Sequence, residues 1–479
     1  MSDSGKSTQP SRRDMLKTAP AAMAAIAAQT AAAQTNAAAK PNVVIIFSDQ
    51  FRGDCIGAAG LNPMGLTPNL DEMANQGTMF TSAICAQPVC APARGSILTS
   101  LYPSRHGTWK NAITLNPDLP TFPKIMKAAG YSTNHIGKWH LGPPEDKGPV
   151  AKQYRGGFDD LWQSSNVLES TSHPYEGDLY DGDGKPMHFE NIYRTDYMTN
   201  LAQNFLRSSA AKSPFLLTLS YLEVHHQNDI DAFVPPKEYQ GKYKNFWVPQ
   251  DLRPLPGSWP SQLGDYYGSV AKMDETVGTI RKTLKETGLD KNTIVMFVSD
   301  HGCHFKTRNT EYKRSPHESS IHVPLIFEGP GFNRGAKIPE MVSHVDIAPS
   351  LLSTLGLTTP ASMQGRNFLP LLDRKTDGWV DEAYFEMSEF ITGRGLRTPQ
   401  YTYAVATPKA PGWKAVNGAD RYQEYMMYDR WADPFEHVNL AGRATHKAEA
   451  EKLRARLAER IFQASGTRAT LEPCEFPYS

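Results

Sequence analysis

The stretch NVVIIFSD, residues 42–49, is an apolar and largely β-branched run that ends in an acid. Such a run is typical of a strand that is buried on both faces of a parallel sheet. TIVMFVSD at 293–300 repeats the same design, and FLLTLSY at 215–221 runs in the same way toward His225. These three stretches therefore predict the central strands of one sheet.

Segments with helical periodicity separate the apolar runs, and one more short run, VPLIF, covers 323–327. The predicted helices cover 68–76, 121–129, 196–208 and 266–284. Strands that alternate with helices indicate an α/β fold with helices on both faces of the sheet. Ligand sites in such sheets lie outside the carboxyl ends of the strands, so Asp49, His225 and Asp300 are expected to converge.

The composition is that of an ordinary globular protein. The chain has 479 residues, 40% of them hydrophobic and 21% charged, which is enough for one large domain and a smaller one. Lys and Arg total 50, and Asp and Glu also total 50. This balance gives no argument for nucleic acid or an anionic membrane as a partner. The five cysteines are too few and too scattered for a disulfide framework.

The first 39 residues have the features of a targeting segment. SRRDMLK at 11–17 is similar to the twin-arginine export motif, and a weakly apolar, Ala-rich stretch follows at 19–39. Polar residues such as Gln29 and Gln34 interrupt that stretch, which argues against stable insertion into a membrane. We therefore expect a twin-arginine-type signal segment at 1–39 and a periplasmic or secreted protein. The alternative is an Ala-rich tail without a targeting function.

The rest of the chain is expected to form a catalytic domain at 40–377 and a small C-terminal subdomain at 378–479. In the subdomain, 397–403 and 424–429 resemble strands of a small antiparallel sheet, and 446–463 has one apolar helical face.

Two polar segments interrupt the predicted catalytic domain. Residues 146–194 are rich in Gly, Asp, Tyr and Ser, and 234–260 are polar and Pro-rich. We interpret the first as a long surface insertion beside the site, and either segment could shape substrate choice.

The most specific motif is CAPAR at 90–94, which continues into GSILTSLYPSRHG at 95–107. This run resembles the signature of the type I, formylglycine-dependent sulfatases of the alkaline phosphatase-like superfamily. Ser100 stands where that family usually has Gly. The resemblance covers nearly the whole mature chain. It implies an α/β/α sandwich with a mostly parallel central sheet, followed by a small C-terminal antiparallel sheet and helix.

The resemblance implies that a formylglycine-generating maturation enzyme oxidises Cys90 to an aldehyde. One hydroxyl of the hydrated aldehyde then attacks sulfur as a nucleophile on a metal ion. The second hydroxyl loses its proton and expels sulfate. Arg94 is expected to fix the hydrated aldehyde.

The same resemblance implies a metal site made of Asp49, Gln50, Cys90, Asp300 and His301. Gln50 stands where the family usually has a second Asp. Oxygen-rich ligation favours Ca²⁺. The imidazole of His301 leaves Mn²⁺ as the alternative.

A second motif, HIGKWHLG at 135–142, has a core that is highly specific to sulfatases. Lys138 and His140 are two residues apart, so both side chains are expected to leave one face of an extended segment. By resemblance, Lys138 binds a sulfate oxygen and His140 assists at the formylglycine hydroxyl.

Two further positions complete the expected site. His225 would contact the sulfate and donate a proton to the leaving alcohol. Val224 replaces the Pro that is common in the family, so His226 remains open as the alternative. Lys313 matches the family's later lysine and would neutralise charge on the sulfate or the leaving group.

The implied activity is metal-dependent hydrolysis of sulfate monoesters, by an exported enzyme that is expected to act on a sulfated small molecule or a glycan. A phosphonate monoester or phosphodiester hydrolase of the same superfamily is the second candidate. A non-catalytic protein that binds sulfated glycans is the third. The sequence leaves open the sulfated position, exo or endo action, the oligomeric state, and the roles of Cys85 and Cys303.

Overall fold

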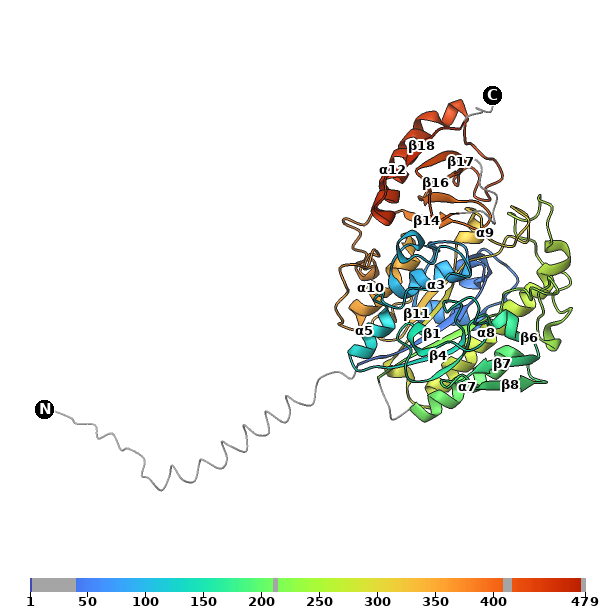
Figure 1. The fold of residues 1–479 in the computed structure, drawn as a ribbon, viewed down its shortest axis with the longest axis vertical. Helices are drawn as coiled ribbons and strands as arrows, with labels where there is room; N and C mark the ends of the chain where they lie inside the picture. The colour runs from blue at the N-terminus through green and yellow to red at the C-terminus, as the bar shows by residue number, and fades with distance from the viewer. Residues whose placement is uncertain (2–39, 210–213, 408–415, 475–479) are drawn as a thin grey trace, which may run out of the picture. The chain divides into compact units, whose positions relative to one another are not determined.

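The computed structural model describes Met1 and residues 40–209, 214–407 and 416–474. The predicted signal segment lies outside the described residues except for Met1. The chain divides into residues 1–40 and residues 41–479, and all elements below belong to the second unit (Figure 1). In the described part of the chain, no helix has the length and apolar character needed to cross a bilayer.

The predicted apolar runs form the centre of a large, mostly parallel sheet. Its order is β12-β2-β11-β10-β1-β9-β4-β5-β7-β6, with β8 on β7. The central strands are parallel to one another, and they are β10 (Thr293–Ser299), β1 (Asn42–Ser48), β9 (Phe215–Tyr221), β4 (Ser132–Lys138) and β5 (Trp162–Ser165). Every residue of β1, β9 and β10 is buried, as the continuous apolar runs predict.

Successive side chains of the central strands point into two separate cores. Val43, Ile45 and Phe47 of β1 lie in one core, and Val44 and Ile46 lie in the other. Helices of the first core are α3 (Cys90–Thr99), α5 (Phe122–Ala128) and α10 (His344–Thr354). Those of the second are α2 (Pro68–Gln76), α7 (Arg194–Ser209) and α8 (Trp259–Glu286). The fold is thus the expected α/β/α sandwich (Figure 1).

Antiparallel strands extend the parallel centre on both sides. One edge holds β11 (Leu325–Glu328) and β2 (Thr78–Phe80), and β12 (Ala336–Ile338) is parallel to β2. The other edge holds β6 (Ser172–His173), β7 (Glu176–Tyr180) and β8 (Pro186–Glu190). The expected surface insertion at 146–194 therefore contributes four strands, β5 to β8, to the sheet. Its polar composition suits edge strands, because each of β7 and β8 buries one residue, Leu179 and Phe189.

A second sheet follows near the C-terminus, with a third core between it and α12 (Lys447–Ser465). Its order is β14 (Ala383–Met387), β15 (Gly393–Arg397), β16 (Tyr401–Ala406), β17 (Arg421–Asp429) and β18 (Thr470–Glu472). The first four strands are antiparallel and β18 is parallel to β17. Leu453, Leu457 and Ile461 are buried in α12, which confirms its predicted apolar face.

The prediction of one strand at 397–403 is wrong, because that range contains a turn between β15 and β16. The backbone N–H of Thr398 donates to the carbonyl of Tyr401 at 2.8 Å, and Thr398 Oγ1 accepts from the N–H of Tyr401 at 2.8 Å. Pro399 lies inside this turn and has no N–H to give to a sheet. Other short α-helices and strands are β3 (Ala83–Ile84), β13 (Val342–Ser343), α4 (Pro103–His106), α6 (Leu168–Thr171), α9 (Glu318–Ile321) and α11 (Leu369–Leu372).

Candidate active site

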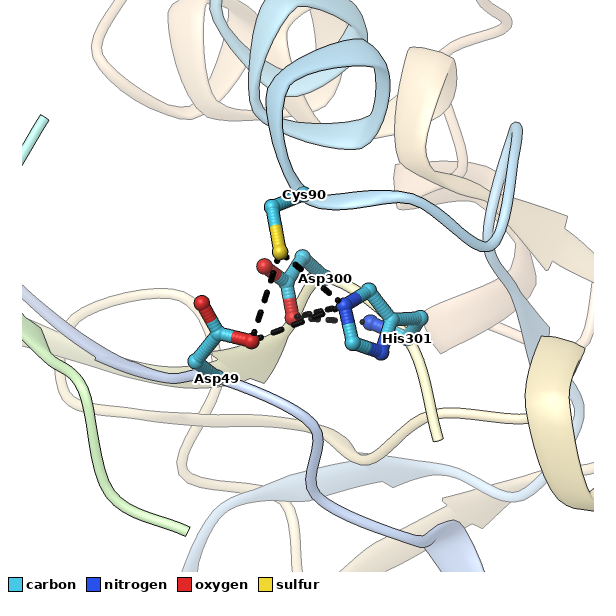
Figure 2. A group of neighbouring side chains, drawn as sticks. All are labelled: Asp49, Cys90, Asp300 and His301. Atoms are coloured by element: carbon cyan, nitrogen blue, oxygen red, sulfur yellow. Dashed lines mark hydrogen bonds and ion pairs between the residues drawn. The ribbon is translucent and has the colours of Figure 1, made fainter. Parts of the chain in front are cut away.

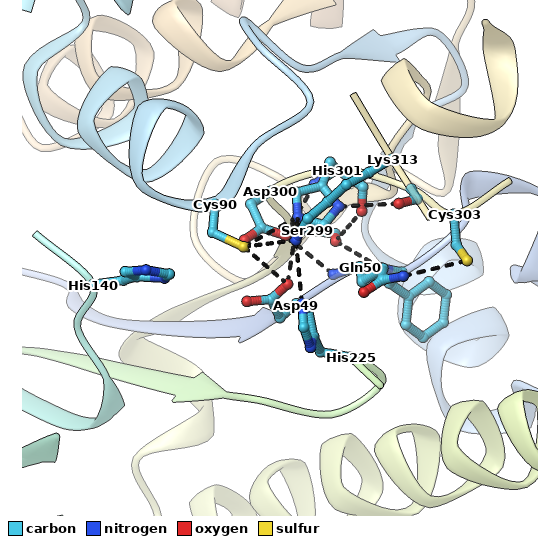
Figure 3. A network of polar contacts seen from close by, with 12 residues as sticks. Asp49, Gln50, Cys90, His140, His225, Ser299, Asp300, His301, Cys303 and Lys313 are labelled. Atoms are coloured by element: carbon cyan, nitrogen blue, oxygen red, sulfur yellow. Dashed lines mark hydrogen bonds and ion pairs between the residues drawn. The ribbon is translucent and has the colours of Figure 1, made fainter. Parts of the chain in front are cut away.

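Two aspartates mark the carboxyl ends of adjacent central strands. Ser48 of β1 pairs with Ser299 of β10, so the next residues, Asp49 and Asp300, lie side by side. Both aspartates are fully buried. The convergence predicted from the topology of the sheet is therefore present, and His225, after β9, faces the same place (Figure 3).

Asp49, Cys90, Asp300 and His301 each point one potential ligand atom at a common centre (Figure 2). These atoms all lie within 4.8 Å of one another. His301 Nε2 is 3.4 Å from Cys90 Sγ, 3.5 Å from Asp49 Oδ1 and 3.6 Å from Asp300 Oδ1. Buried carboxylates, an imidazole and a thiol at this spacing form a donor set that suits a divalent cation.

The electrostatics of the two carboxyl groups also fit a cation. Burial alone would raise the pKa of Asp49. The positive charges of Lys138, His225 and Arg94 outweigh this effect, so the pKa of Asp49 falls well below its usual range. The pKa of Asp300 is raised, first by burial and then by the charge of Asp49. Asp300 Oδ2 accepts no hydrogen bond from the described residues. A cation between the two groups would stabilise both carboxylates.

Gln50 lies next to this group, with φ at +66°. Its backbone N–H donates to Asp300 Oδ1 at 3.1 Å. Its side-chain amide donates to Cys303 Sγ at 3.3 Å, and Oε1 lies 3.3 Å from His226 Nδ1. Cys303 and His226 therefore hold the amide of Gln50 beside the four potential ligands. The role of Gln50 as a metal ligand stays a prediction.

Cys90 is the first residue of α3 and is 1% exposed. Its Sγ is 2.9 Å from Lys313 Nζ and 3.9 Å from Lys138 Nζ. Burial raises the pKa of the Cys90 thiol, but Lys138, Lys313, His301 and His140 together lower it well below the usual range. This environment stabilises negative charge at the position of Cys90 Sγ.

Arg94 lies one turn further along α3 and joins the two aspartates. Its guanidinium donates to Asp49 Oδ2 at 3.0 Å and to Ser220 Oγ at 2.8 Å. Its Nε lies 3.3 Å from Asp300 Oδ2. The side chain also lies over the ring of Phe47, 4.4 Å from the ring centroid. In this structure Arg94 therefore orients the carboxylates behind Cys90.

Lys138 ends β4 and is fully buried between two carboxylates. Its Nζ donates to Asp49 Oδ2 at 2.8 Å and to Glu169 Oε1 at 3.0 Å. His140 follows with φ at +63°, and its Nδ1 lies 3.9 Å from the same Glu169 oxygen. Lys138 and His140 therefore lie near the same oxygen of Glu169, and their contact with one sulfate stays a prediction.

The two neighbouring histidines differ in direction. His225 Nε2 is 3.2 Å from Lys313 Nζ, and its Nδ1 is 2.6 Å from the carbonyl oxygen of His226. Because a carbonyl oxygen only accepts, Nδ1 of His225 carries the proton and Nε2 faces the site. Lys313 Nζ is also 3.0 Å from His301 Nε2. His226 instead contacts Gln50 and stacks on His225.

A cavity of about 360 Å³ opens above these groups. Its walls include Cys90, Asn111, Glu169, His225, His226, Asn228, Asp231, Lys306, Glu311, Tyr312, Lys313 and Arg314. Glu169 is one of the wall residues that the sequence did not indicate, because it lies in a polar segment without a recognisable motif. Cys85 is packed in the first core, where its Sγ lies 3.8 Å from the carbonyl oxygen of Ser320.

Comparison with known proteins agrees with this geometry. The family model described as "Sulfatase" matches residues 41–357, and one described as "N-sulphoglucosamine sulphohydrolase, C-terminal" matches 310–463. An ulvan-active sulfatase from Formosa agariphila is 31% identical over 445 residues, which cover 88% of this chain and 81% of that protein. An N-acetylglucosamine-6-O-sulfatase from Bacteroides thetaiotaomicron is 26% identical, with 88% of this chain and 86% of that protein covered.

Among solved structures, a Bacteroides fragilis protein described as a candidate sulfatase superposes with a TM-score of 0.77 at 26% identity. The match covers 89% of this chain and 96% of that protein. The sheet, the buried cysteine at the start of α3 and the extent of these matches lead to one conclusion. The chain belongs to the formylglycine-type sulfatase family of the alkaline phosphatase-like superfamily.

Proposed function

We propose that this sulfatase hydrolyses sulfate monoesters of carbohydrates, with Cys90 converted to formylglycine as the nucleophile. The observation that carries the proposal is the position of Cys90 Sγ, between Lys138 and Lys313 and at the edge of the four-residue metal group. In the mature enzyme Cys90 Sγ is replaced by the oxygen atoms of the hydrated aldehyde. Sugar substrates are supported by the N-acetylglucosamine-6-O-sulfatase among the relatives.

A divalent cation would be held by Asp49, Asp300 and His301, with Gln50 and the modified Cys90 as further ligands. Such an ion acts as a Lewis acid and lowers the pKa of a bound hydroxyl group. We propose Ca²⁺ because most donors are oxygen atoms, with Mn²⁺ as the alternative because of the imidazole of His301.

The protein side chains then have separate tasks. Lys138 and Lys313 bind sulfate oxygens and stabilise the charge that builds up in the transition state. One hydroxyl of the hydrated aldehyde attacks sulfur, and the S–O bond to the leaving alcohol breaks. His225 acts in its doubly protonated form: Nε2, which faces the cavity, gives its proton to the leaving alcohol, and Nδ1 keeps the proton that it donates to the carbonyl oxygen of His226.

His140 takes the proton of the second hydroxyl of the hydrated aldehyde. The bond between the aldehyde carbon of residue 90 and the oxygen that carries the sulfate then breaks. Sulfate leaves, and the aldehyde is regenerated.

The proposal includes the steps before catalysis. A formylglycine-generating enzyme modifies Cys90, and the twin-arginine segment at 1–39 directs the protein to the periplasm or the medium. We also propose a catalytic domain at 40–377 and a small C-terminal subdomain at 378–479.

The test is to express the chain together with a formylglycine-generating enzyme and to measure sulfate release from a panel of sulfated monosaccharides. We expect release that depends on both the modification and the metal. If no sulfate ester is cleaved while an aryl phosphonate is cleaved rapidly, the phosphonate hydrolase is the correct assignment.

A further inference from the structure

Glu169 is an acid placed among the groups that would bind the sulfate. It comes from the short helix α6, and its side chain is only 5% exposed. Oε1 accepts from Lys138 Nζ at 3.0 Å and lies 3.9 Å from His140 Nδ1. Oε2 is buried and accepts no hydrogen bond from any described residue. One oxygen of Glu169 therefore orients Lys138, and the other is left without a protein donor.

Glu169 is also a wall residue of the 360 Å³ cavity that contains Cys90. Burial raises its pKa, but Lys138, His140 and His225 lower it, with a net fall to about 2. A negative charge at Cys90 acts in the opposite direction and raises the pKa of Glu169. The carboxylate is thus ionised and senses an anion at the position of the nucleophile.

A fixed carboxylate in a buried site discriminates between anions by their charge. A sulfate monoester carries one negative charge, whereas a phosphate monoester carries close to two above its second pKa of about 6. The two esters have nearly the same shape and the same oxygen atoms. Repulsion from a buried carboxylate a few ångströms away is therefore about twice as large for the phosphate ester.

We propose that Glu169 is a specificity-determining residue that favours singly charged sulfate esters and disfavours doubly charged phosphate monoesters. The inference rests on the proposed function, since it places the scissile group between Cys90, Lys138 and Lys313. It explains why a negatively charged side chain, which repels anions, is present in a site that binds an anion. It also assigns a role to the 146–194 segment, which supplies that acid.

The experiment compares Glu169→Gln with the wild-type enzyme, both carrying formylglycine, on three esters of 4-nitrophenol at pH 8. The esters are the sulfate (one charge), the phosphate (two charges) and the methyl phosphate diester (one charge). In the Gln variant we expect the phosphate-to-sulfate ratio of kcat/KM to rise by about tenfold or more. The diester-to-sulfate ratio should stay within about twofold, because both esters carry one charge.

Two further variants separate charge from packing. Glu169→Asp keeps the charge, and its phosphate-to-sulfate ratio should match the wild type. Glu169→Ala is a second neutral variant in case the Gln variant does not fold. Glu190→Gln removes an exposed acid on β8 and is the matched control, with no expected change.

The proposal is overturned if the phosphate-to-sulfate ratio of a folded neutral variant equals that of the wild type. It is also overturned if both ratios rise together, since that would indicate a looser site. A wild-type enzyme that cleaves no sulfate ester at all would instead contradict the proposed function, so the two failures can be told apart.

Discussion

At the scale of single residues, the site works by bringing opposite charges together in a buried place. Lys138 is paired with Asp49 and Glu169, and Arg94 is paired with Asp49 and lies beside Asp300. Each of these buried charges has a partner of opposite sign, which matters because an unpaired buried charge costs several kcal/mol. The site is therefore already arranged before a substrate arrives.

Cys90→Ala should abolish sulfate release while the fold is retained. The variant lacks the thiol whose oxidation would give the proposed nucleophile, but it removes only one buried sulfur atom, with an expected loss of about 1 kcal/mol in stability. Turnover and thermal unfolding check this prediction. Cys85→Ala, at a buried cysteine five positions earlier, is the control and should retain turnover. Near-normal turnover in the Cys90 variant would end the proposed mechanism.

Asp300→Asn should weaken metal binding by about tenfold or more, because it removes one of the negative charges that hold the cation. The metal content of the purified protein, measured by mass spectrometry, checks this and also identifies the ion. Asp290→Asn changes an exposed acid and is the control. An unchanged metal content in the Asp300 variant would refute its assignment as a ligand.

His225→Ala should lower kcat by about 100-fold or more, since it removes the proposed acid. His226→Ala should lower kcat by only about tenfold, through its contact with Gln50. Measuring kcat of both variants on the same substrate shows which histidine is the proton donor. A larger loss for the His226 variant would show that the neighbouring histidine is the functional one.

Motif residues were predictable from the sequence and Glu169 was not, for a physical reason. Cys90, Lys138 and Lys313 occur in runs where several residue types must coincide, so the pattern itself is informative. Glu169 acts through one carboxylate whose position depends on how α6 packs after the chain has folded. The contacts of Gln50 with Cys303 and His226 depend in the same way on tertiary structure.

At the scale of elements, one carboxylate connects two helices of the second core. Asp274 of α8 accepts from the backbone N–H groups of Asn69 and Leu70, at 3.1 and 2.8 Å, at the start of α2. It also accepts from Asn69 Nδ2 at 2.8 Å. The first N–H groups of a helix have no partner within the helix, so this acid caps α2 from outside.

Asp274→Ala should lower the free energy of unfolding by about 2–3 kcal/mol, because it leaves these donors without their acceptor. Urea unfolding followed by circular dichroism measures the change. Glu451→Ala, at an exposed acid on α12, is the control and should change stability by less than about 0.5 kcal/mol. A loss below about 0.5 kcal/mol for the Asp274 variant would contradict the capping role.

The central strands of the large sheet were easier to predict than the strands at the edges of the sheets. The run at 42–49 is buried on both faces, so composition alone identifies it. The strands β7 and β8 bury one residue each, and their polar composition resembles that of a loop. The strand boundary at Thr398 depends on a turn, and the apolar pattern on both sides hides it.

At the scale of the whole molecule, buried neutral histidines make stability depend on pH. Burial lowers the pKa of His106 to about 3 and that of His135 to about 3. In the unfolded chain these side chains take up protons near pH 6.5. The stability that each contributes is therefore fully present above pH 6.5 and is lost as the pH falls toward 3.

At pH 4.5 each of these histidines should have cost about 2–3 kcal/mol of stability relative to pH 7.5. His135 stacks on Trp162 and its Nδ1 has no partner among the described residues, so His135→Phe should make the pH dependence shallower. Urea unfolding of both proteins at pH 7.5 and 4.5 checks this. Equal losses in the two proteins would contradict the assignment.

The burial of Cys90 has a consequence for the order of events in the cell. At 1% exposure and at the start of a helix, the residue cannot enter the cleft of another enzyme once this part of the chain has folded. The proposed oxidation of Cys90 would therefore have to precede folding, and the two processes would compete in time. A chain that folds too early would be well packed, correctly shaped and permanently inactive. Slow folding around α3 would then be an advantage to this protein.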